Sequence, residues 1–303
     1  MMKQAMILAA GRGKRLGVLT EDQPKPLTQV NGITMLDNAV QHLIDAGYDR
    51  LTVVIGYEGE QIRQALDAYR GKIDLCFIEN PQWATTNNIY SLYLARNELR
   101  GEVTLLEGDI FFDASVLAAL DAQQAGRSYL AVSPLNSLME GAFVQTGEAG
   151  EVTGFYSTKD GSHHSAEQAW KTVNLYRLSA DLSAFLQEAL ERKIQAGDTD
   201  LYYELLFRDA LENGHGFQAV EVPTAAWVEI DNAYDMVLGE YQFSEHKHDQ
   251  LKGQYGGYWR YPITDFTLIY NFHFPPQELK TKMIERFDHI MLNYPANPRL
   301  FTG

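Results

Sequence analysis

The sequence contains one cysteine, Cys76, in an apolar run at residues 73–78 that we expect to form a buried strand. A single cysteine excludes a disulfide within the chain, and an apolar setting makes a poor catalytic thiol. The chain also lacks an apolar run long enough to cross a membrane, and its short N-terminal apolar stretch ends in glycines instead of a cleavage site. We therefore expect a cytoplasmic protein without a signal peptide.

Positive charge is scarce as well. The chain has 25 lysines and arginines against 40 aspartates and glutamates, which gives a formal net charge of −15. Nucleic acids and anionic membranes need a basic surface, so we expect neither as a partner. Against this acidic background Arg12, Lys14, Arg15 and Lys25 form a local basic cluster. Such a cluster suits a small anionic ligand bound together with a metal ion.

Strand and helix patterns alternate at short spacing in the first half of the chain, which is typical of a layered α/β sheet. After an N-terminal strand we expect helices at residues 34–47, 60–69 and 87–99, and strands at 51–55, 73–78 and 103–106. Shorter strands are expected at 143–145, 152–156, 172–178 and 217–222, and helices at 182–195, 200–213 and 233–247. The 303 residues, of which 45% are hydrophobic, suffice for one large core. We predict a Rossmann-like, mixed, mostly parallel sheet flanked by helices over residues 1–250, followed by a C-terminal extension.

The first strand ends in a glycine-rich loop with the sequence Leu8-Ala9-Ala10-Gly11-Arg12-Gly13-Lys14-Arg15-Leu16. Its two glycines allow backbone N–H groups to close around an anion. The loop is neither a dinucleotide fingerprint, because Leu16 replaces the third glycine, nor a Walker A loop, because Arg15 follows Lys14. We expect it to hold the phosphates of a nucleoside triphosphate, the alternative being a basic surface turn.

Three further charged residues complete a candidate centre for phosphoryl chemistry. Lys25 lies between two prolines, which stiffen the backbone and suit a lysine that must point one way. Asp109 and Asp231 each follow an apolar strand, so their carboxylates can meet at one edge of the sheet and share Mg²⁺. The alternatives are a surface lysine and aspartates that cap the following turns.

The glycine-rich loop and the motif Pro24-Lys25-Pro26-Leu27 together resemble the signature of the sugar-phosphate and choline-phosphate nucleotidyltransferases. The segment at residues 87–94, Asn-Asn-Ile-Tyr-Ser-Leu-Tyr-Leu, is similar to a word of the phosphocholine cytidylyltransferases that lies near their cytidine site. The resemblance implies CTP as donor, with Lys25, Arg15 and Asp109 as catalytic residues. It implies nucleotide contacts by Leu8, Ala9, Ala10, Gly11, Arg12, Gly13, Lys25, Asn80, Thr85, Asn87, Asn88 and Ser91. Asn87 is equally suited to cap the helix that begins there.

The acceptor side departs from the choline-phosphate enzymes, which place an aromatic residue beside the trimethylammonium group. In the choline-phosphate enzymes this aromatic residue is a tryptophan, and Gly141 aligns with it. The pair Glu140-Gly141, followed by a Lys-x-x-Asn-x-Tyr word at Lys171, instead resembles the 2-aminoethylphosphonate cytidylyltransferases. This resemblance implies that the acceptor is bound by Glu140, Gly141, Lys171, Asn174, Tyr176 and Glu229.

These observations predict Mg²⁺-dependent transfer of CMP from CTP to a small phosphonate, with 2-aminoethylphosphonate as the expected acceptor. Choline phosphate, hydroxyethylphosphonate and aminophosphonobutyrate are alternative acceptors within the same class. An alternative of another class is a catalytically silent nucleotide-binding module with a regulatory role. The pair His163-His164 suits a metal, although adjacent histidines in a polar loop are commonly solvated.

The C-terminal extension over residues 251–303 contains a linker rich in glycine and tyrosine at 254–258. The following words Ile263-Thr264-Asp265-Phe266, Tyr270-Asn271 and Phe274-Pro275-Pro276 resemble the opening of a pyridoxal-phosphate aminotransferase of the histidinol-phosphate type. The resemblance implies the start of a truncated second domain, and hence fusion to an aminotransferase that makes or modifies the acceptor.

Overall fold

The computed structural model describes residues 2–135, 139, 141–157, 169–247 and 276–285. The chain divides into two compact units, residues 1–252 and 253–303. In the second unit the described part contains helix α9 (Gln277–Glu285). The predicted linker and the aminotransferase-like words lie outside the described residues, apart from Pro276.

One half of the main sheet in the first unit is parallel, with the N-terminal strand inside it. Strand β1 lies between β4 and β6, and β5 pairs with the far side of β4. The bounds are β1 (Gln4–Ala9), β4 (Arg50–Ile55), β5 (Asp74–Glu79) and β6 (Val103–Glu107). Ile7 stands opposite both Val53 and Leu106, so the strands end together at one edge of the sheet.

The other half of the sheet is built around the long strand β11 (Ala169–Leu178), which pairs antiparallel with β6, β8 and β9. Its partners and their neighbours are β8 (Ser128–Pro134), β9 (Ala142–Thr146), β10 (Val152–Ser157) and β12 (Phe217–Glu221). Two small sheets pair β7 (Ile110–Phe112) with β13 (Trp227–Glu229) and β2 (Gln29–Val30) with β3 (Ile33–Thr34).

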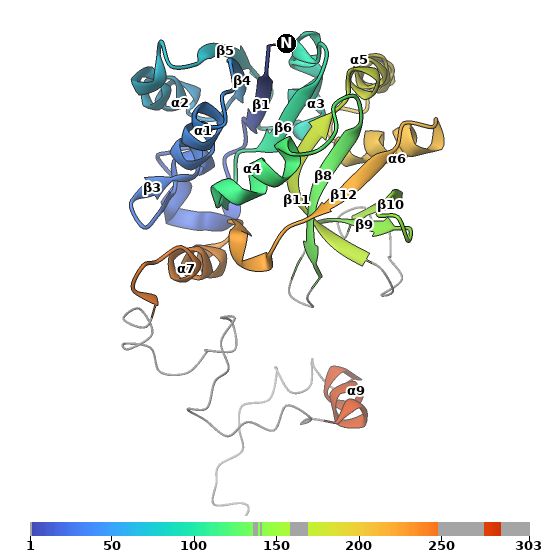
Figure 1. The fold of residues 1–303 in the computed structure, drawn as a ribbon. Helices are drawn as coiled ribbons and strands as arrows, with labels where there is room; N and C mark the ends of the chain where they lie inside the picture. The colour runs from blue at the N-terminus through green and yellow to red at the C-terminus, as the bar shows by residue number, and fades with distance from the viewer. Residues whose placement is uncertain (1, 136–138, 140, 158–168, 248–275, 286–303) are drawn as a thin grey trace, which may run out of the picture. The chain divides into compact units, whose positions relative to one another are not determined.

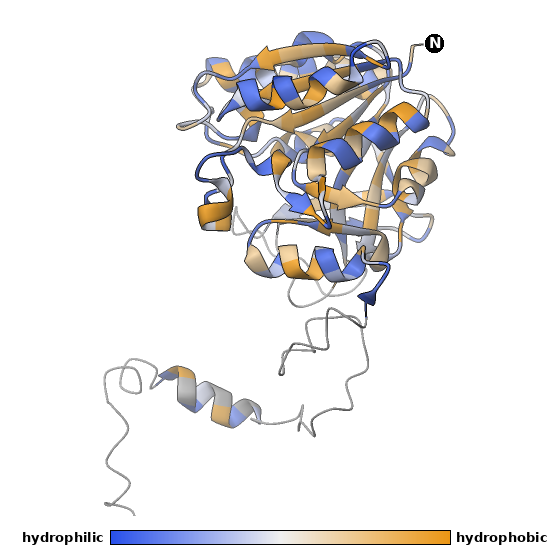
Figure 2. Ribbon diagram, turned by 90° about the vertical axis from the view of Figure 1, so that its left-hand side faces the viewer, coloured by the Kyte–Doolittle hydropathy of each residue, from blue (hydrophilic) through white to orange (hydrophobic). Residues whose placement is uncertain are grey.

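Helices cover both faces of the sheet (Figure 1). One face packs against α1 (Met35–Asp45), α2 (Gly59–Leu66) and α4 (Ala114–Asp121), and the other against α3 (Asn88–Leu94), α5 (Ala180–Gln195) and α6 (Glu204–Glu212). Alternate residues of β1 divide between two core clusters, Ala5, Ile7 and Ala9 in one and Met6 and Leu8 in the other. Figure 2 accordingly shows largely hydrophobic strands beneath helices of mixed hydropathy. The predicted α/β class, with a mixed sheet flanked by helices, is confirmed.

Several predicted elements differ from the structure. Cys76 lies in β5, which is an edge strand with half-buried residues, so the expectation of a buried strand was wrong. An apolar run does not reveal whether a strand has one neighbour or two. The helix predicted to reach residue 99 ends at Leu94, and α7 (Ala233–Gln242) is shorter than expected. Strand β8 and helix α4 were not predicted. In the described parts of the chain, every helix is too short or too polar to cross a membrane.

Candidate active site

A cavity of about 280 Å³ opens where β1 and β6 end. Parallel strands joined by crossovers place ligand sites at this edge. The walls combine the glycine loop, the start of α3 and the segments after β6 and β13. The lining residues are Leu8, Ala9, Ala10, Gly11, Gly13, Arg15, Lys25, Pro26, Asn80, Trp83, Thr86, Asn87, Asn88, Ser91, Glu107, Gly108, Asp109, Tyr202, Glu229 and Asp231.

The glycine loop and Lys25 are built against each other. Gly13 has φ +74°, a conformation that side chains rarely adopt, and a Cβ there would lie 2.8 to 2.9 Å from carbons of the Lys25 side chain. Pro24 is extended, and Pro26 lies inside the short 3-10 turn Lys25–Leu27. The prolines thus fix the backbone on both sides of Lys25, while Gly13 leaves room for its side chain.

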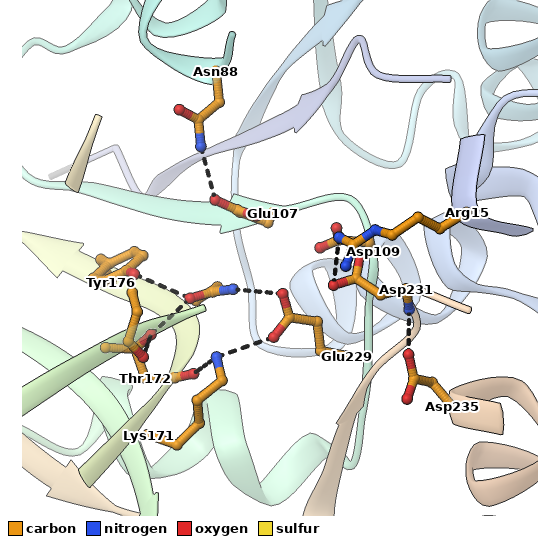
Figure 3. Close-up of polar contacts among 12 residues, drawn as sticks. Arg15, Asn88, Glu107, Asp109, Lys171, Thr172, Tyr176, Glu229, Asp231 and Asp235 are labelled. Atoms are coloured by element: carbon orange, nitrogen blue, oxygen red, sulfur yellow. Dashed lines mark hydrogen bonds and ion pairs between the residues drawn. The ribbon is translucent and has the colours of Figure 1, made fainter. Parts of the chain in front are cut away.

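Lys25 joins the two aspartates that the sequence singled out. Its Nζ lies 2.7 Å from Asp109 Oδ2 and 2.6 Å from Asp231 Oδ1. Arg15 reaches the other oxygen of Asp231, with its guanidinium 2.8 Å from Oδ2 (Figure 3). The two cations predicted to be catalytic and the two predicted metal ligands therefore form one charged cluster at the cavity.

The environment of Lys25 keeps its ammonium group charged. Burial is the largest single influence and lowers the pKa of Lys25, because an ion loses hydration in the interior. The charges of Asp109 and Asp231, and the hydrogen bonds that they accept, together outweigh burial and hold the pKa above its usual value. Lys25 is thus a fixed positive charge and not a proton donor at neutral pH.

Backbone contacts hold the two aspartates together. The Ile230 N–H donates to the Asp109 carbonyl at 3.0 Å, which joins the segments after β6 and β13. Asp235 in the first turn of α7 accepts from the backbone N–H of Asp231 at 2.8 Å and of Asn232 at 3.0 Å. Burial, with the nearby charges of Asp231 and Glu229, raises the pKa of Asp235 although these hydrogen bonds lower it.

The acidic residues at this point fit a divalent metal ion. Carboxylate oxygens of Asp109, Glu229 and Asp231 lie within 4.8 Å of one another. Asp109 Oδ1 is buried and has no hydrogen-bond partner among the described residues. Oxygen ligands of this kind are those that Mg²⁺ prefers. The structure therefore adds Glu229, expected only as an acceptor contact, to the two candidate metal ligands.

The other end of the cavity carries amide and hydroxyl groups. The buried Asn80 donates to Ser91 Oγ at 3.1 Å and Thr86 Oγ1 at 3.2 Å. Asn87 caps α3 by accepting from the Asn88 N–H at 2.8 Å. Asn80 thus positions two hydroxyl groups. Thr85, which was predicted to contact the nucleotide, is exposed and does not line the cavity, whereas its neighbour Thr86 does.

Two of the predicted acceptor residues, Lys171 and Asn174, contact a third, Glu229 (Figure 3). Its two oxygens lie 3.0 Å from Lys171 Nζ and 3.5 Å from Asn174 Nδ2. Asn174 Oδ1 accepts from the hydroxyls of Thr172, at 2.8 Å, and Tyr176, at 3.2 Å. Glu229 lines the cavity, whereas Lys171, Asn174 and Tyr176 are buried behind it.

Gly141 lies at the same place and adopts a conformation suited to glycine. Its φ is +99°, and a Cβ added there would lie 3.4 Å from Lys171 Nζ and 4.0 Å from Glu229 Oε2. A side chain at this position would therefore enter the space beside the lysine. Glu140, its predicted companion, lies outside the described residues, as do His163 and His164.

Arg12 does not line the cavity. Its guanidinium lies 5.3 Å from the centre of the Tyr57 ring, and Tyr57 packs edge-on against Trp83 at 5.0 Å. Trp83 itself lines the cavity, so Arg12 supports the wall from outside.

Trp83, Thr86, Glu107 and Tyr202 line the cavity although sequence reasoning assigned them no role. Glu107 had a usable signal, because it is the last residue of the strand that leads to Asp109, and Asn88 Nδ2 donates to it at 3.3 Å. Tyr202 had none. It lies far from the motifs in sequence and reaches the cavity through the connection between α5 and α6.

Comparison with known proteins places this geometry among nucleotidyltransferases. The family model of the MobA-like NTP transferase domain matches residues 5–191. A CMP-5'-(3-aminopropyl)phosphonate synthase of Streptomyces rubellomurinus is 34% identical over 97% of this chain and 47% of its own length. A 2-aminoethylphosphonate cytidylyltransferase of Lancefieldella rimae is 37% identical over 35% of this chain and 42% of its own.

Among solved structures, the CTP:phosphocholine cytidylyltransferase of Streptococcus pneumoniae has a TM-score of 0.67 at 23% identity, covering 80% of this chain and all of that one. That likeness concerns the fold alone. The chain spans about half the length of the Streptomyces synthase. From the extent of the family match, the chain belongs to the family of MobA-like NTP transferase domains.

Proposed function

We propose that this chain transfers CMP from CTP to a small phosphonate, with an aminoalkylphosphonate as the preferred acceptor. The observation that carries the proposal is the cluster of Lys25, Asp109 and Asp231 beside the glycine loop. Two relatives are named for the CMP ester of 3-aminopropylphosphonate and for cytidylyl transfer to 2-aminoethylphosphonate. These two compounds are the acceptors that we propose first.

In the proposed reaction a phosphonate oxygen attacks the α-phosphorus of CTP in line. A P–O bond forms to that oxygen while the bond from the α-phosphorus to the bridging oxygen breaks, and pyrophosphate leaves with the electron pair. The attacking oxygen is already an anion, so no general base is needed, and positioning and charge neutralisation account for catalysis.

The cations of the cluster have defined tasks in this proposal. Lys25 and Arg15 exchange carboxylate oxygens for phosphate oxygens as CTP enters, and the N–H groups of the glycine loop bind the same phosphates. Mg²⁺ held by Asp109 and Asp231 would neutralise phosphate charge at the reacting centre. Asn80, Ser91 and Thr86 offer the donors and acceptors that suit the edge of a cytosine ring.

Gly141 and Lys171 are the residues that support a phosphonate over choline phosphate. Without an aromatic side chain at Gly141, a quaternary ammonium has no cation–π partner at that position. The ammonium of Lys171 is suited to a phosphonate instead, and the carboxylates nearby suit a primary ammonium group.

A panel of acceptors tests the proposed function. The purified chain is given CTP, Mg²⁺ and 2-aminoethylphosphonate, 3-aminopropylphosphonate, hydroxyethylphosphonate or choline phosphate, and pyrophosphate release is measured. We expect kcat/KM for an aminoalkylphosphonate to exceed that for choline phosphate by at least about tenfold. Equal rates with choline phosphate would refute the argument from Gly141. CTP binding without release for every acceptor would favour a regulatory module.

The cluster is tested by Lys25→Ala and Asp109→Asn. Either change should lower kcat by about a hundredfold or more while leaving the fold intact, because each removes charge placed at the reacting phosphates. Asp121→Asn is a matched control, since Asp121 also pairs with a lysine, Lys3, at 2.7 Å but lies on α4 away from the cavity. Near-normal turnover in either cluster variant would contradict the mechanism.

A further inference from the structure

Glu229 separates Lys171 from the cavity. The Lys171 side chain is only 2% exposed, and its Nζ lies 3.0 Å from Glu229 Oε2 and donates to the Thr172 carbonyl at 2.9 Å. Glu229 is part of the cavity lining and Lys171 is not. The carboxylate therefore occupies the place where an anionic acceptor would meet the lysine.

The same carboxylate belongs to the candidate metal group. Oxygens of Glu229, Asp109 and Asp231 lie within 4.8 Å of one another. Carboxylates this close repel one another unless cations lie among them. In the structure Lys25 and Arg15 pair with the aspartates and Lys171 pairs with Glu229. Glu229 is thus the member of the group that pairs with the acceptor-side lysine, Lys171, while the two aspartates pair with Lys25 and Arg15.

A buried ammonium group does not give up its anion without a replacement, because an unpaired buried charge is costly. A phosphonate can replace the carboxylate of Glu229, since both groups carry their negative charge on oxygen atoms. When the phosphonate takes Lys171, Glu229 loses its ionic partner, keeps the amide of Asn174 at 3.5 Å, and lies beside the carboxylates of Asp109 and Asp231. Binding a divalent cation then stabilises the carboxylate of Glu229.

We propose that Glu229 is shared between two ligands: it holds Lys171 while the acceptor is absent, and it binds the divalent cation once the acceptor's phosphonate occupies Lys171. This inference rests on the proposed function, because it requires a phosphonate at Lys171. Its consequence is thermodynamic. Acceptor and metal strengthen each other's binding by the same factor, since coupling between two sites is reciprocal.

Mn²⁺ binding to the full chain tests this coupling without catalysis. Free Mn²⁺ is measured by electron paramagnetic resonance in the absence of CTP, with and without 2-aminoethylphosphonate or 3-aminopropylphosphonate, and corrected for binding to the phosphonate alone. We expect the acceptor to lower the Kd of Mn²⁺ by about fivefold or more. In Glu229→Gln the factor should fall to near one.

Glu102→Gln is the matched control, because Glu102 also pairs with a basic residue of β11, Arg177, at 3.0 Å but is not part of the cavity lining. It should keep the wild-type factor. Lys171→Met should bind Mn²⁺ more tightly without acceptor and gain nothing from it, because Glu229 is no longer held. Should that variant not fold, Glu229→Gln alone decides.

Two results would overturn the inference: no coupling in the wild type, or the same coupling in Glu229→Gln. The second result would mean that the phosphonate itself meets the metal and that Glu229 is not involved. Transfer of CMP to a phosphonate without coupling overturns this inference and leaves the proposed function intact. Absence of both transfer and coupling overturns both.

Discussion

At the scale of single residues, Gly13 and Lys25 constrain each other most directly. Gly13 has a positive φ, and carbons of Lys25 lie within 2.9 Å of the point that a Cβ would occupy, so there is no room for a side chain. Gly11 in the same loop has open space around it and no positive φ. Backbone conformation and space therefore require glycine at position 13 and not at position 11.

The first prediction compares alanine at these two positions. Gly13→Ala should destabilise the protein by about 1 to 3 kcal/mol, because the backbone is strained and Lys25 has to move. It should also lower turnover, since the displaced lysine leaves its carboxylates. Gly11→Ala should change the free energy of unfolding by no more than about 0.5 kcal/mol. Urea unfolding measures both, and equal losses would show that Lys25 does not fill the space at Gly13.

The backbone conformation of Asn174 in β11 explains how one strand can present both Lys171 and Asn174 to the carboxylate of Glu229. Side chains alternate between the faces of a regular strand, so residues three apart point in opposite directions. Asn174 has φ +59°, and the pairing of β11 with β8 shifts register between Thr172 and Tyr176. This β-bulge re-aims the side chains, and both Lys171 and Asn174 reach Glu229.

At the scale of elements, side-chain caps begin two helices, α7, which follows Asp231, and α4, which packs against the sheet away from the cavity. Asn232 and Asp235 form a reciprocal capping box at the start of α7, and the same Asp235 holds the backbone of Asp231. Asp113 caps α4 by accepting from the Ser115 N–H at 2.9 Å. Hydrogen bonds from Ser115 hold the pKa of Asp113 below its usual value of 3.8.

The second prediction concerns this cap and pH. Because the folded protein lowers the pKa of Asp113, the ionised carboxylate stabilises the fold above its ordinary pKa, and that contribution is lost as the pH falls through the folded value. Asp113→Ala should cost about 1 kcal/mol at neutral pH. The difference from wild type should shrink in acid below the usual pKa, as measured by denaturant unfolding across pH. A difference that stays constant into acid would exclude the carboxylate as the source.

At the scale of the whole molecule, the hydrophobic core that the described residues form lies in the first of the two units. Every described core residue, and every half-buried one packed against it, lies between Ala5 and Phe243. The candidate site is likewise lined by residues from Leu8 to Asp231. The described residues of the first unit thus contain both this core and the charged cluster at the cavity.

The third prediction is that residues 1–247 fold and act without the rest. Truncation after residue 247 should change the melting temperature by only a few degrees, about what 1 kcal/mol produces in a domain of this size. The rate of pyrophosphate release should stay within about twofold of the rate of the full chain, because the cavity is lined by residues of the first unit. A twofold change in rate corresponds to less than about 1 kcal/mol of activation free energy. A large loss of either quantity would show that the second unit supports the first.

Local chemistry explains which features were predictable from the sequence. The glycine loop, the proline-flanked lysine and the two aspartates after apolar strands depend on short-range conformation and spacing, so the residues that line this end of the cavity and the α/β class could be predicted from the sequence. Thr86 was missed in favour of its neighbour Thr85 because spacing does not determine which of two adjacent hydroxyls faces the cavity.

Tertiary structure alone decided how the charges are shared. Lys25 contacts residues that lie far along the chain, Asp109 and Asp231, because β13 pairs with β7 and the Ile230 N–H donates to the Asp109 carbonyl, which brings the two segments together. Glu229 stands between Lys171 and the two aspartates because the bulge in β11 and the pairing of β13 with β7 bring these segments together. The sequence by itself determined which charges and which turns are present, since those depend on residue type. Only the fold decided which charge neutralises which, since Coulombic attraction depends on distances that the chain path sets.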